Sequence, residues 1–510
     1  MRLSLRILQI GAIAVVVTVS TFHAFELDRF FVAKELVLHA AAVLAALFAW
    51  RGLRDLEMTR LDWLLAGFLG LSALSALFAT NRWLGLRGLA VSVSSVLIYW
   101  VARTHRRVLV NALAFAVIVA AVTSLLQTYG LDIELFSENR APGGTLGNRN
   151  FIAHVAAFGL PLLLFLTITA RRRRTFLWSA IGTALVTASL VITRSRAAWL
   201  AFAAMLVVLL FALVASRSLR RDGRTWRRLG FTVVVAAITI GAVLVLPNAL
   251  HWKSKNPYLE SIHKVADYSG GSGRGRLIQY EHTLGLAVRH PLFGVGPGNW
   301  AVEYPTRAPS SDPSMNESEQ GMTMNPWPSS DWVAFLAERG PWATILLGLF
   351  FLGVIRLGIR QLFSATEADE ALAAAALLGV VAGALVAGLF DAVLMTAVPA
   401  YIVFGAMGAL PSVAPAILPA KRSNMLLFVA LILVSAVGAY RSASQLIAMD
   451  IYTTARTRAQ LEHGSQIDPG NFRLHLRLAR GGKTRCEHAK AAHALYPSAQ
   501  IAKQLARGCR

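Results

Sequence analysis

Apolar runs of about 20 residues recur along almost the whole chain before Ser442, and they constrain the fold more than any other feature. A helix of that length crosses the roughly 30 Å hydrocarbon core of a bilayer. The period-2 alternation of membrane barrel strands is absent. The composition agrees, since 55% of the residues are hydrophobic and only 15% are charged. The pattern therefore predicts an all-α polytopic integral membrane protein.

The apolar runs predict about 12–13 transmembrane helices. The first run follows Arg2 and Arg6 as in a signal peptide, but no clear small-x-small cleavage site precedes the charged FELDRFF, so we expect a retained anchor. The expected spans are residues 7–25, 31–50, 61–79, 84–102, 108–128, 150–170, 175–193, 197–215, 229–247, 341–359, 370–392, 394–411 and 424–441.

Short basic clusters predict how the spans are oriented. If the N-terminus is cytoplasmic, all of these clusters fall on the cytoplasmic side, where positive residues accumulate. They are residues 51–60, 103–107, 171–174 and 216–228, the Arg356/Arg360 segment and Lys421-Arg422. Topology thus accounts for much of the net charge of +23, and we expect no nucleic-acid partner.

Two regions are then expected outside the cytoplasm. One is a polar segment over residues 247–340, inserted in a membrane domain over 1–441. The other is a tail over 442–510, whose aliphatic stripes predict either a degenerate tetratricopeptide-like repeat or a small helical cap. The two cysteines of the chain, Cys486 and Cys509, both lie in this tail and form either a disulfide or two free thiols.

Arginines stand at the ends of two external turns. Arg149 follows the glycines and asparagines of GTLGNRNFIAH (144–154), where the amides of a helix N-terminus favour an anion; the alternative is a simple turn and cap. Arg194 and Arg196 lie in TRSRAAW (193–199), on the side that the positive-inside trend disfavours. Their planar guanidinium groups suit diphosphate oxygens, or they extend to lipid phosphates instead.

A third external stretch, residues 272–300, begins with Arg274 and Arg276 and ends at His290-Pro291 and GVGPG. Its aliphatic stripe predicts a re-entrant or interfacial helix that presents the arginines at the membrane surface, or an ordinary surface helix with a solvated basic end. GVGPG follows no strand and is not a dinucleotide fingerprint. We expect Arg276 and this turn to close over a site that Arg196 and the turn at 143–154 complete.

The fourth stretch, SSDWVAFLAERG (329–340), places Asp331 in the first turn of a helix, where an acid often interacts with the helix dipole. Gly340-Pro341 is expected to break this helix at the membrane edge. P-loop, GxSxG and HExxH motifs are absent, and the histidines lack zinc-binding spacing. We therefore predict neither a metal nor a cofactor.

These four segments, in this order, resemble the O-antigen ligase / O-antigen polymerase (Wzy_C-type) superfamily of bacterial inner-membrane glycosyltransferases. The resemblance implies transfer of an undecaprenyl-diphosphate-linked glycan at the periplasmic face, to lipid A-core, another glycan or a protein hydroxyl. By resemblance, Arg196 and Arg276 occupy the places of family arginines that contact the donor diphosphate. Arg149, Arg194 and Arg274 are expected to support them. Fixed guanidinium charge stabilises a diphosphate leaving group, so the expected enzyme is metal-independent.

One departure from the family concerns acceptor activation. Ligases of the family commonly have a histidine where this chain has Ser329, and a serine is no general base near neutral pH. Three readings stay open: Asp331, His282 or His290 supplies the base; the chain is a polymerase or other transferase that activates its acceptor differently; or catalysis is impaired. Two other classes also stay open, a transporter or flippase of lipid-linked glycan and a non-catalytic scaffold of glycan assembly.

Overall fold

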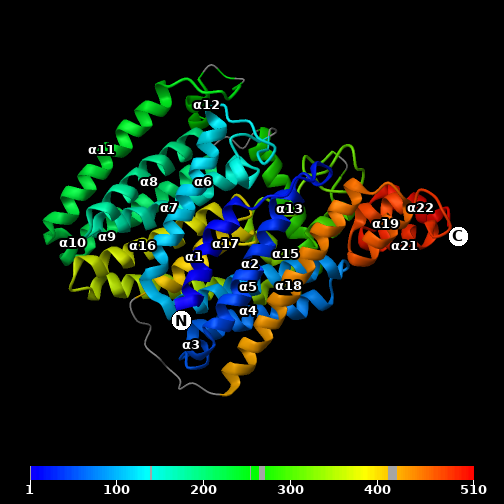
Figure 1. The fold of residues 1–510 in the computed structure, drawn as a ribbon, viewed down its shortest axis with the longest axis horizontal. Coiled ribbons are helices and arrows are strands. Elements are labelled where there is room, and N and C mark those ends of the chain that lie inside the picture. Colours follow the sequence, from blue (N-terminus) through cyan, green and yellow to red (C-terminus); the bar gives the residue numbers. More distant parts are fainter. Residues whose placement is uncertain are drawn as a thin grey trace.

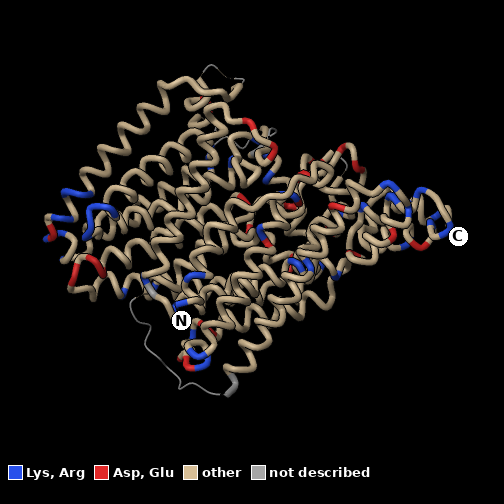
Figure 2. The backbone as a smooth tube through the Cα atoms, viewed as in Figure 1, with Lys and Arg blue, Asp and Glu red and all other residues tan. Residues whose placement is uncertain are grey.

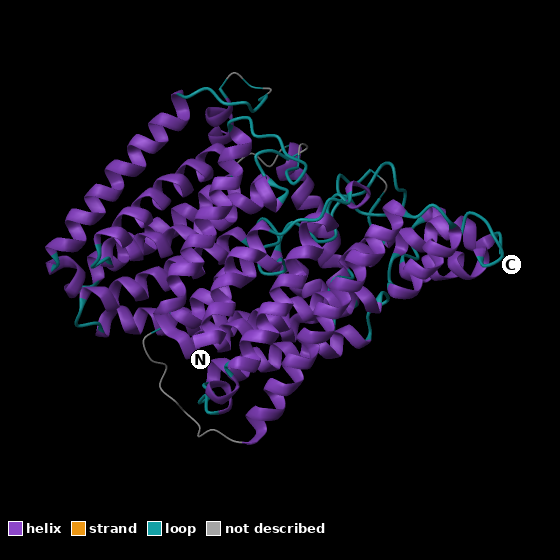
Figure 3. Ribbon diagram, viewed as in Figure 1, coloured by secondary structure: helices purple, strands orange, loops and turns teal. Residues whose placement is uncertain are grey.

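The computed structural model describes residues 2–137, 140–252, 254, 256–263, 270–309, 311–411 and 422–509. Within these residues the secondary structure is helical and contains no strand, apart from one isolated bridge between Met315 and Thr323 (Figure 3). Among the described helices, eleven are long and apolar enough to cross a membrane. The predicted all-α polytopic membrane protein is therefore confirmed.

The eleven helices coincide with eleven of the expected spans. They are α2 (Asp28–Phe48), α4 (Arg60–Leu77), α5 (Arg82–His105), α6 (Val110–Thr128), α7 (Arg149–Thr169), α8 (Arg173–Ile192), α9 (Arg196–Ala215), α11 (Gly223–Val245), α15 (Asp331–Ser364), α16 (Ala368–Ala387) and α18 (Arg422–Thr454). The other two expected spans correspond to shorter helices, α1 (Arg2–Val17) and α17 (Ala397–Ala409). The first expected span, residues 7–25, was placed too far along the chain. The helix α1 ends at Val17, and the amide of Ser20 donates to the carbonyl of Arg29 rather than to a carbonyl of α1.

The helix α7 runs through the middle of the bundle and is almost entirely buried, whereas α11 lies at the outer edge (Figure 1). Small residues allow the close packing of α7: a Cβ on Gly159 would lie 2.4 Å from Cγ1 of Val117 in α6. The exposed side of α11 carries Val233, Val234 and Ile238, as expected of a face that meets lipid.

Charged residues gather at the ends of the helices. Figure 2 shows Lys and Arg around the short helices α10 (Arg217–Arg221) and α3 (Trp50–Arg54), whereas the spanning helices are mostly uncharged along their lengths. Lys421, from the last of the predicted basic clusters, lies outside the described residues. Which end of the bundle faces the cytoplasm stays a prediction.

The polar segment contains α12 (Pro257–His263), α13 (Gly271–Arg289), α14 (Trp300–Glu303) and the 3-10 turn η4 (Tyr304–Thr306). The tail contains α19 (Arg458–Ile467), α20 (Phe472–Leu478), α21 (Arg485–Leu495) and α22 (Gln500–Arg507). Figure 1 shows the tail projecting from one end of the bundle. Its boundary at 441/442 stays a prediction, because α18 continues through it to Thr454. A disulfide joins Cys486 to Cys509.

Candidate functional site

Arg149 and Arg194 converge on the ring of Trp252, in the polar segment. Their guanidinium carbons lie 5.6 and 4.6 Å from its centroid, within the range of cation–π attraction. Arg194 adopts a left-handed backbone conformation (φ 54°) in the tight turn between α8 and α9. Its Nε donates to Oγ of Ser261 in α12 at 3.0 Å. We call Arg149, Arg194, Trp252 and Ser261 the tryptophan cluster.

The tryptophan cluster carries an excess of positive charge. Burial, and then the charge of Arg149, lowers the pKa of the Arg194 guanidinium, which nevertheless stays protonated because arginine titrates so far above neutral pH. Among the described residues, Arg194 pairs with one acid, the partly exposed Glu260, at 3.8 Å. Arg196 is half-buried and begins α9 just after this turn. Such an arrangement suits an anion with several oxygens.

A second group forms around His154, five residues after Arg149 in α7. This ring is fully buried, and neither of its nitrogens has a hydrogen-bond partner among the described residues. Arg276 in α13 and Asp391 in the α16–α17 loop lie near enough for their charges to act on this ring. We call His154, Arg276 and Asp391 the histidine cluster.

The histidine cluster brings together two of the segments that the sequence singled out, 144–154 and the start of 272–300. The structure adds two residues that had no predicted role, His154 and Asp391. His154 is the last residue of the motif GTLGNRNFIAH (144–154), and its place in that motif was a sequence signal for a role. Asp391 follows the observed helix α16 but lies inside the expected span 370–392, and the sequence analysis gave it no role.

Asp331 lies at the start of α15 and is fully buried. Its Oδ1 accepts from the amide of Val393 at 3.0 Å and its Oδ2 from the amide of Leu394 at 2.8 Å. Its own amide donates to the carbonyl of Gly388 at 2.8 Å. Asp331 therefore holds the loop that presents Asp391, and both of its oxygens are engaged by backbone. This geometry favours a positioning role, while its predicted role as a base stays untested.

The two predicted histidines lie away from both clusters. Nε2 of His282 is 3.9 Å from the buried carboxylate of Asp312, and its place in α13 is about 120° around the helix from Arg276. His290 is exposed and follows the C-terminus of α13, about 20 Å along the axis from Arg276. Arg274 is exposed in the first turn of the same helix. The structure thus brings Arg276 to the site without either histidine.

The GVGPG turn packs against α15 rather than over the arginines. The amides of Val295 and Gly296 donate to the carbonyls of Ala337 and Glu338 at 3.0 and 2.8 Å. The carboxylate of Glu338 accepts from the amides of Gly298 and Trp300 at 2.8 and 3.2 Å. This corrects the expected closure, because the turn lies at the opposite end of α13 from Arg276.

The helix α15 breaks at Gly340 as expected, with φ 78° just before Pro341. The buried carboxylate of Glu338, which holds the GVGPG turn, had no role in the sequence analysis, although the motif shows an acid two residues before this break.

Ser329, the serine at the expected histidine position, is held by α13. The amide of Ser329 donates to Oε1 of Gln279 at 2.6 Å, and the hydroxyl of Tyr280 donates to the carbonyl of Ser329 at 2.7 Å.

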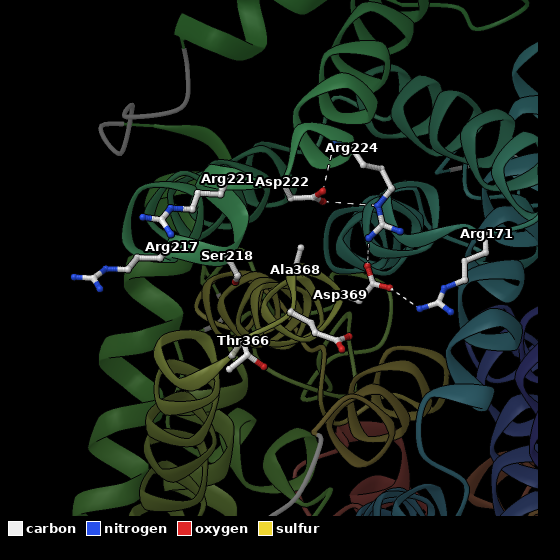
Figure 4. A pocket seen from close by; sticks show the side chains of 11 residues that line it. Arg171, Arg217, Ser218, Arg221, Asp222, Arg224, Thr366, Ala368 and Asp369 are labelled. Atoms are coloured by element: carbon white, nitrogen blue, oxygen red, sulfur yellow. Dashed lines mark hydrogen bonds and ion pairs between the residues drawn. The ribbon is translucent and has the colours of Figure 1, made fainter.

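A cavity of about 610 Å³ lies at the other end of the bundle, among the basic loops (Figure 4). Figure 4 shows Arg224 between Asp222 and Asp369, with Arg171 approaching Asp369 from the far side; all three contacts are ion pairs. They tie the edge helix α11 to α16 and include no predicted site residue. Within the described part of the chain, no three His, Cys, Asp or Glu side chains group as metal ligands would.

Comparison with protein families gives a match over part of the chain. The O-antigen ligase model, Wzy_C, matches residues 181–340, from the middle of α8 to the break in α15. The match includes Arg194, Arg196, Arg276 and Asp331, and it confirms the predicted resemblance to the ligase and polymerase superfamily. The segment at 144–154 and the tail lie outside it. Comparison with curated proteins found no match.

Proposed function

We propose, with the O-antigen ligase match as premise, that this membrane protein transfers a polyprenyl-diphosphate-linked glycan to an acceptor at the periplasmic face of a bacterial inner membrane. One observation carries the proposal: guanidinium groups from distant parts of the chain meet around the first two turns of α7. Arg149 and Arg194 meet at Trp252 in the tryptophan cluster, and Arg276 lies near enough for its charge to act on His154 in the second turn.

The arginines act on the donor. As the bond from the sugar anomeric carbon to the diphosphate breaks, negative charge develops on the leaving oxygen. Planar guanidinium groups bind such oxygens in pairs and need no proton exchange to stay charged. Trp252 holds Arg149 and Arg194 beforehand, and Ser261 also holds Arg194, so these two groups need little reorganisation when the charge develops. In this proposal Arg196 and Arg276 bind the diphosphate, with Arg149 and Arg194 in support.

Asp391 is the group best placed to accept the proton of the acceptor hydroxyl. Its side chain is only half-buried, and its Oδ1 accepts from the neighbouring amide of Ala392 at 2.9 Å. The acceptor oxygen bonds to the anomeric carbon while its proton passes to the Asp391 carboxylate and the diphosphate departs. This assignment supplies a base although Ser329 stands where the family histidine is expected. Asp331, His282 and His290 are the alternatives from the sequence.

Two features support the proposed orientation. The basic loops near α3 and α10 suit a cytoplasmic face. The disulfide between Cys486 and Cys509 suits an oxidising compartment, as a periplasmic tail would meet.

The proposal is tested by Arg196→Ala and Arg276→Ala in a cell-surface glycan assay, with Arg289→Ala as control. Arg289 is exposed at the opposite end of α13, so its loss removes equal charge without touching either cluster. We expect both site variants to lose surface glycan at normal expression while the control keeps it. Unchanged glycan in both site variants would overturn the donor site. Undecorated core in a deletion strain indicates a ligase, and single-repeat decoration indicates a polymerase.

A further inference from the structure

A cleft of about 520 Å³ lies where the tail meets the polar segment. The loop from Ser318 to Met322 forms one wall, and the end of α18 together with α20 and α22 forms the others. The tail lies beyond the O-antigen ligase match, which ends at residue 340. No role follows from the match for this cleft, so its chemistry has to be read from its own side chains.

Three arginines line one wall. Arg473, Arg477 and Arg480 follow one another at helical spacing, so they share a face of α20 and its end, and all three are exposed. Arg473 pairs with Glu319 at 3.2 Å. Arg477 and Arg480 have no acidic partner among the described residues. The cleft therefore keeps an excess of two positive charges.

The arginine face is held in place by the end of α18. Nη1 of Arg477 donates to the carbonyl of Tyr452 at 2.6 Å, and its guanidinium lies 5.2 Å from the centroid of the Tyr452 ring. Stacking on the ring fixes the plane of this guanidinium while leaving other N–H groups available for a ligand.

The facing wall carries amides. Gln500 and Gln504 stand one turn apart on α22, and both are exposed toward the cleft. An amide side chain both donates and accepts, which matches neighbouring hydroxyl groups on a sugar ring.

The cleft is formed before any ligand arrives. The amide of Gln500 donates to the carbonyl of Gln320 at 3.0 Å, which fixes α22 against the loop. Gly321 makes this close approach possible, since it has φ 81° and a Cβ there would lie 2.0 Å from the carbonyl oxygen of Ser498. Arg473 and Glu319 add an ion pair across the same junction.

We propose that this cleft binds an acidic saccharide, a phosphorylated or carboxylated stretch of a glycan chain. The guanidinium groups of Arg477 and Arg480 bind the phosphate or carboxylate. Gln500 and Gln504 bind the hydroxyl groups. Assigning this saccharide to the acceptor or to the donor glycan rests on the proposed function, and the kinetic arm below distinguishes the two.

The binding test uses the full-length protein in detergent and three probes. They are the phosphorylated core oligosaccharide released from a rough-type lipopolysaccharide, the same oligosaccharide after phosphatase treatment, and a polyglutamate peptide. We expect the phosphorylated oligosaccharide to bind at least tenfold more tightly than the treated one, with affinity that falls as salt rises. Equal binding of both oligosaccharides with no dependence on salt, or tighter binding of the peptide, would overturn the proposal.

The variants are Arg477→Gln/Arg480→Gln and, as a charge-matched control, Arg485→Gln/Lys490→Gln. The control residues are exposed on α21, which contributes nothing to the cleft. We expect the first variant to lose at least tenfold in affinity for the phosphorylated oligosaccharide and the control to bind as the wild type does. Wild-type affinity in the cleft variant would refute the assignment, provided that its thermal unfolding matches that of the control.

A transfer assay identifies the source of the saccharide. A raised KM for the acceptor with unchanged kcat places the acceptor in the cleft, and a raised KM for the donor places the donor glycan there. Unchanged KM values for both substrates would contradict a role in transfer. The inference and the proposed function fail separately: an Arg276→Ala variant that still transfers glycan overturns the donor site, yet leaves the cleft to be judged by its own binding data.

Discussion

Replacing Asp331 by asparagine separates a positioning role from a catalytic one. The substitution keeps the shape of the side chain but removes its charge. In the structure each carboxylate oxygen accepts from one backbone amide, of Val393 at 3.0 Å and of Leu394 at 2.8 Å. An asparagine offers one acceptor oxygen and turns an N–H donor toward the second amide. One of the two amides is therefore left without an acceptor in a fully buried place.

The expected loss of stability is large. A hydrogen bond to a charged group contributes about 1.5–3 kcal/mol, and leaving a buried donor unpaired costs about 1–3 kcal/mol. Together these amount to roughly 3–5 kcal/mol, because the remaining bond of the asparagine also becomes a weaker, neutral one. Folded proteins are typically stable by only about 5–15 kcal/mol. We expect Asp331→Asn to express poorly and to unfold at a clearly lower temperature.

The assay measures thermal unfolding of the purified variants together with glycan transfer by whatever protein remains folded. Asp391→Asn is the matched comparison, because Asp391 is half-buried and, among the described residues, its carboxylate accepts from the amide of Ala392 alone. We expect Asp391→Asn to unfold as the wild type does and to lose transfer. An Asp331→Asn variant with wild-type stability and no transfer would refute this reasoning and would make Asp331 the base.

Two further predictions concern the tail and the GVGPG turn. Burial lowers the pKa of both His475 and His488, whose Nδ1 atoms are 3.0 Å apart, so the unfolded tail binds more protons below about pH 6.5. Stability from this pair is present above that pH and lost below it: proteolysis of the tail should be faster at pH 5 than at pH 7.5, and equal rates would contradict this. Gly294→Ala places a Cβ 2.4 Å from the carbonyl carbon of Glu338 at φ 66° and should lower expression, whereas Gly285→Ala, with no atom within 4 Å, should not.

The spans were predictable because each one follows from a local property, a run of apolar residues long enough to cross a bilayer. That is why eleven of the thirteen expected runs coincide with described helices long and apolar enough to cross a membrane, while the other two correspond to the shorter α1 and α17. The bounds of the first expected span were wrong because the apolar run continues past Val17. The helix itself ends there, and the amide of Ser20 donates to the carbonyl of Arg29. Hydropathy gives no information on that pairing.

The site was only partly predictable. The arginines stood out because, in the predicted orientation, Arg194 and Arg196 oppose the positive-inside trend. The partners did not stand out, since Trp252 and Asp391 lie far along the chain from α7. Their convergence depends on how the helices pack. The structure also shows that both carboxylate oxygens of Asp331 accept hydrogen bonds from backbone amides. A sequence motif does not tell such an acid from one that is available to accept a proton.

The most direct test of the central claim is turnover in proteoliposomes. Purified protein is supplied with a polyprenyl-diphosphate-linked glycan and an acceptor, and both the glycosylated acceptor and the released polyprenyl diphosphate are measured. The account predicts that the wild type and Arg289→Ala form both products in equal amounts and that Arg276→Ala forms neither. Movement of the intact donor across the membrane without transfer would instead indicate a transporter. Wild-type protein that neither transfers nor moves the donor, or an Arg276→Ala variant as active as the wild type, would contradict the account.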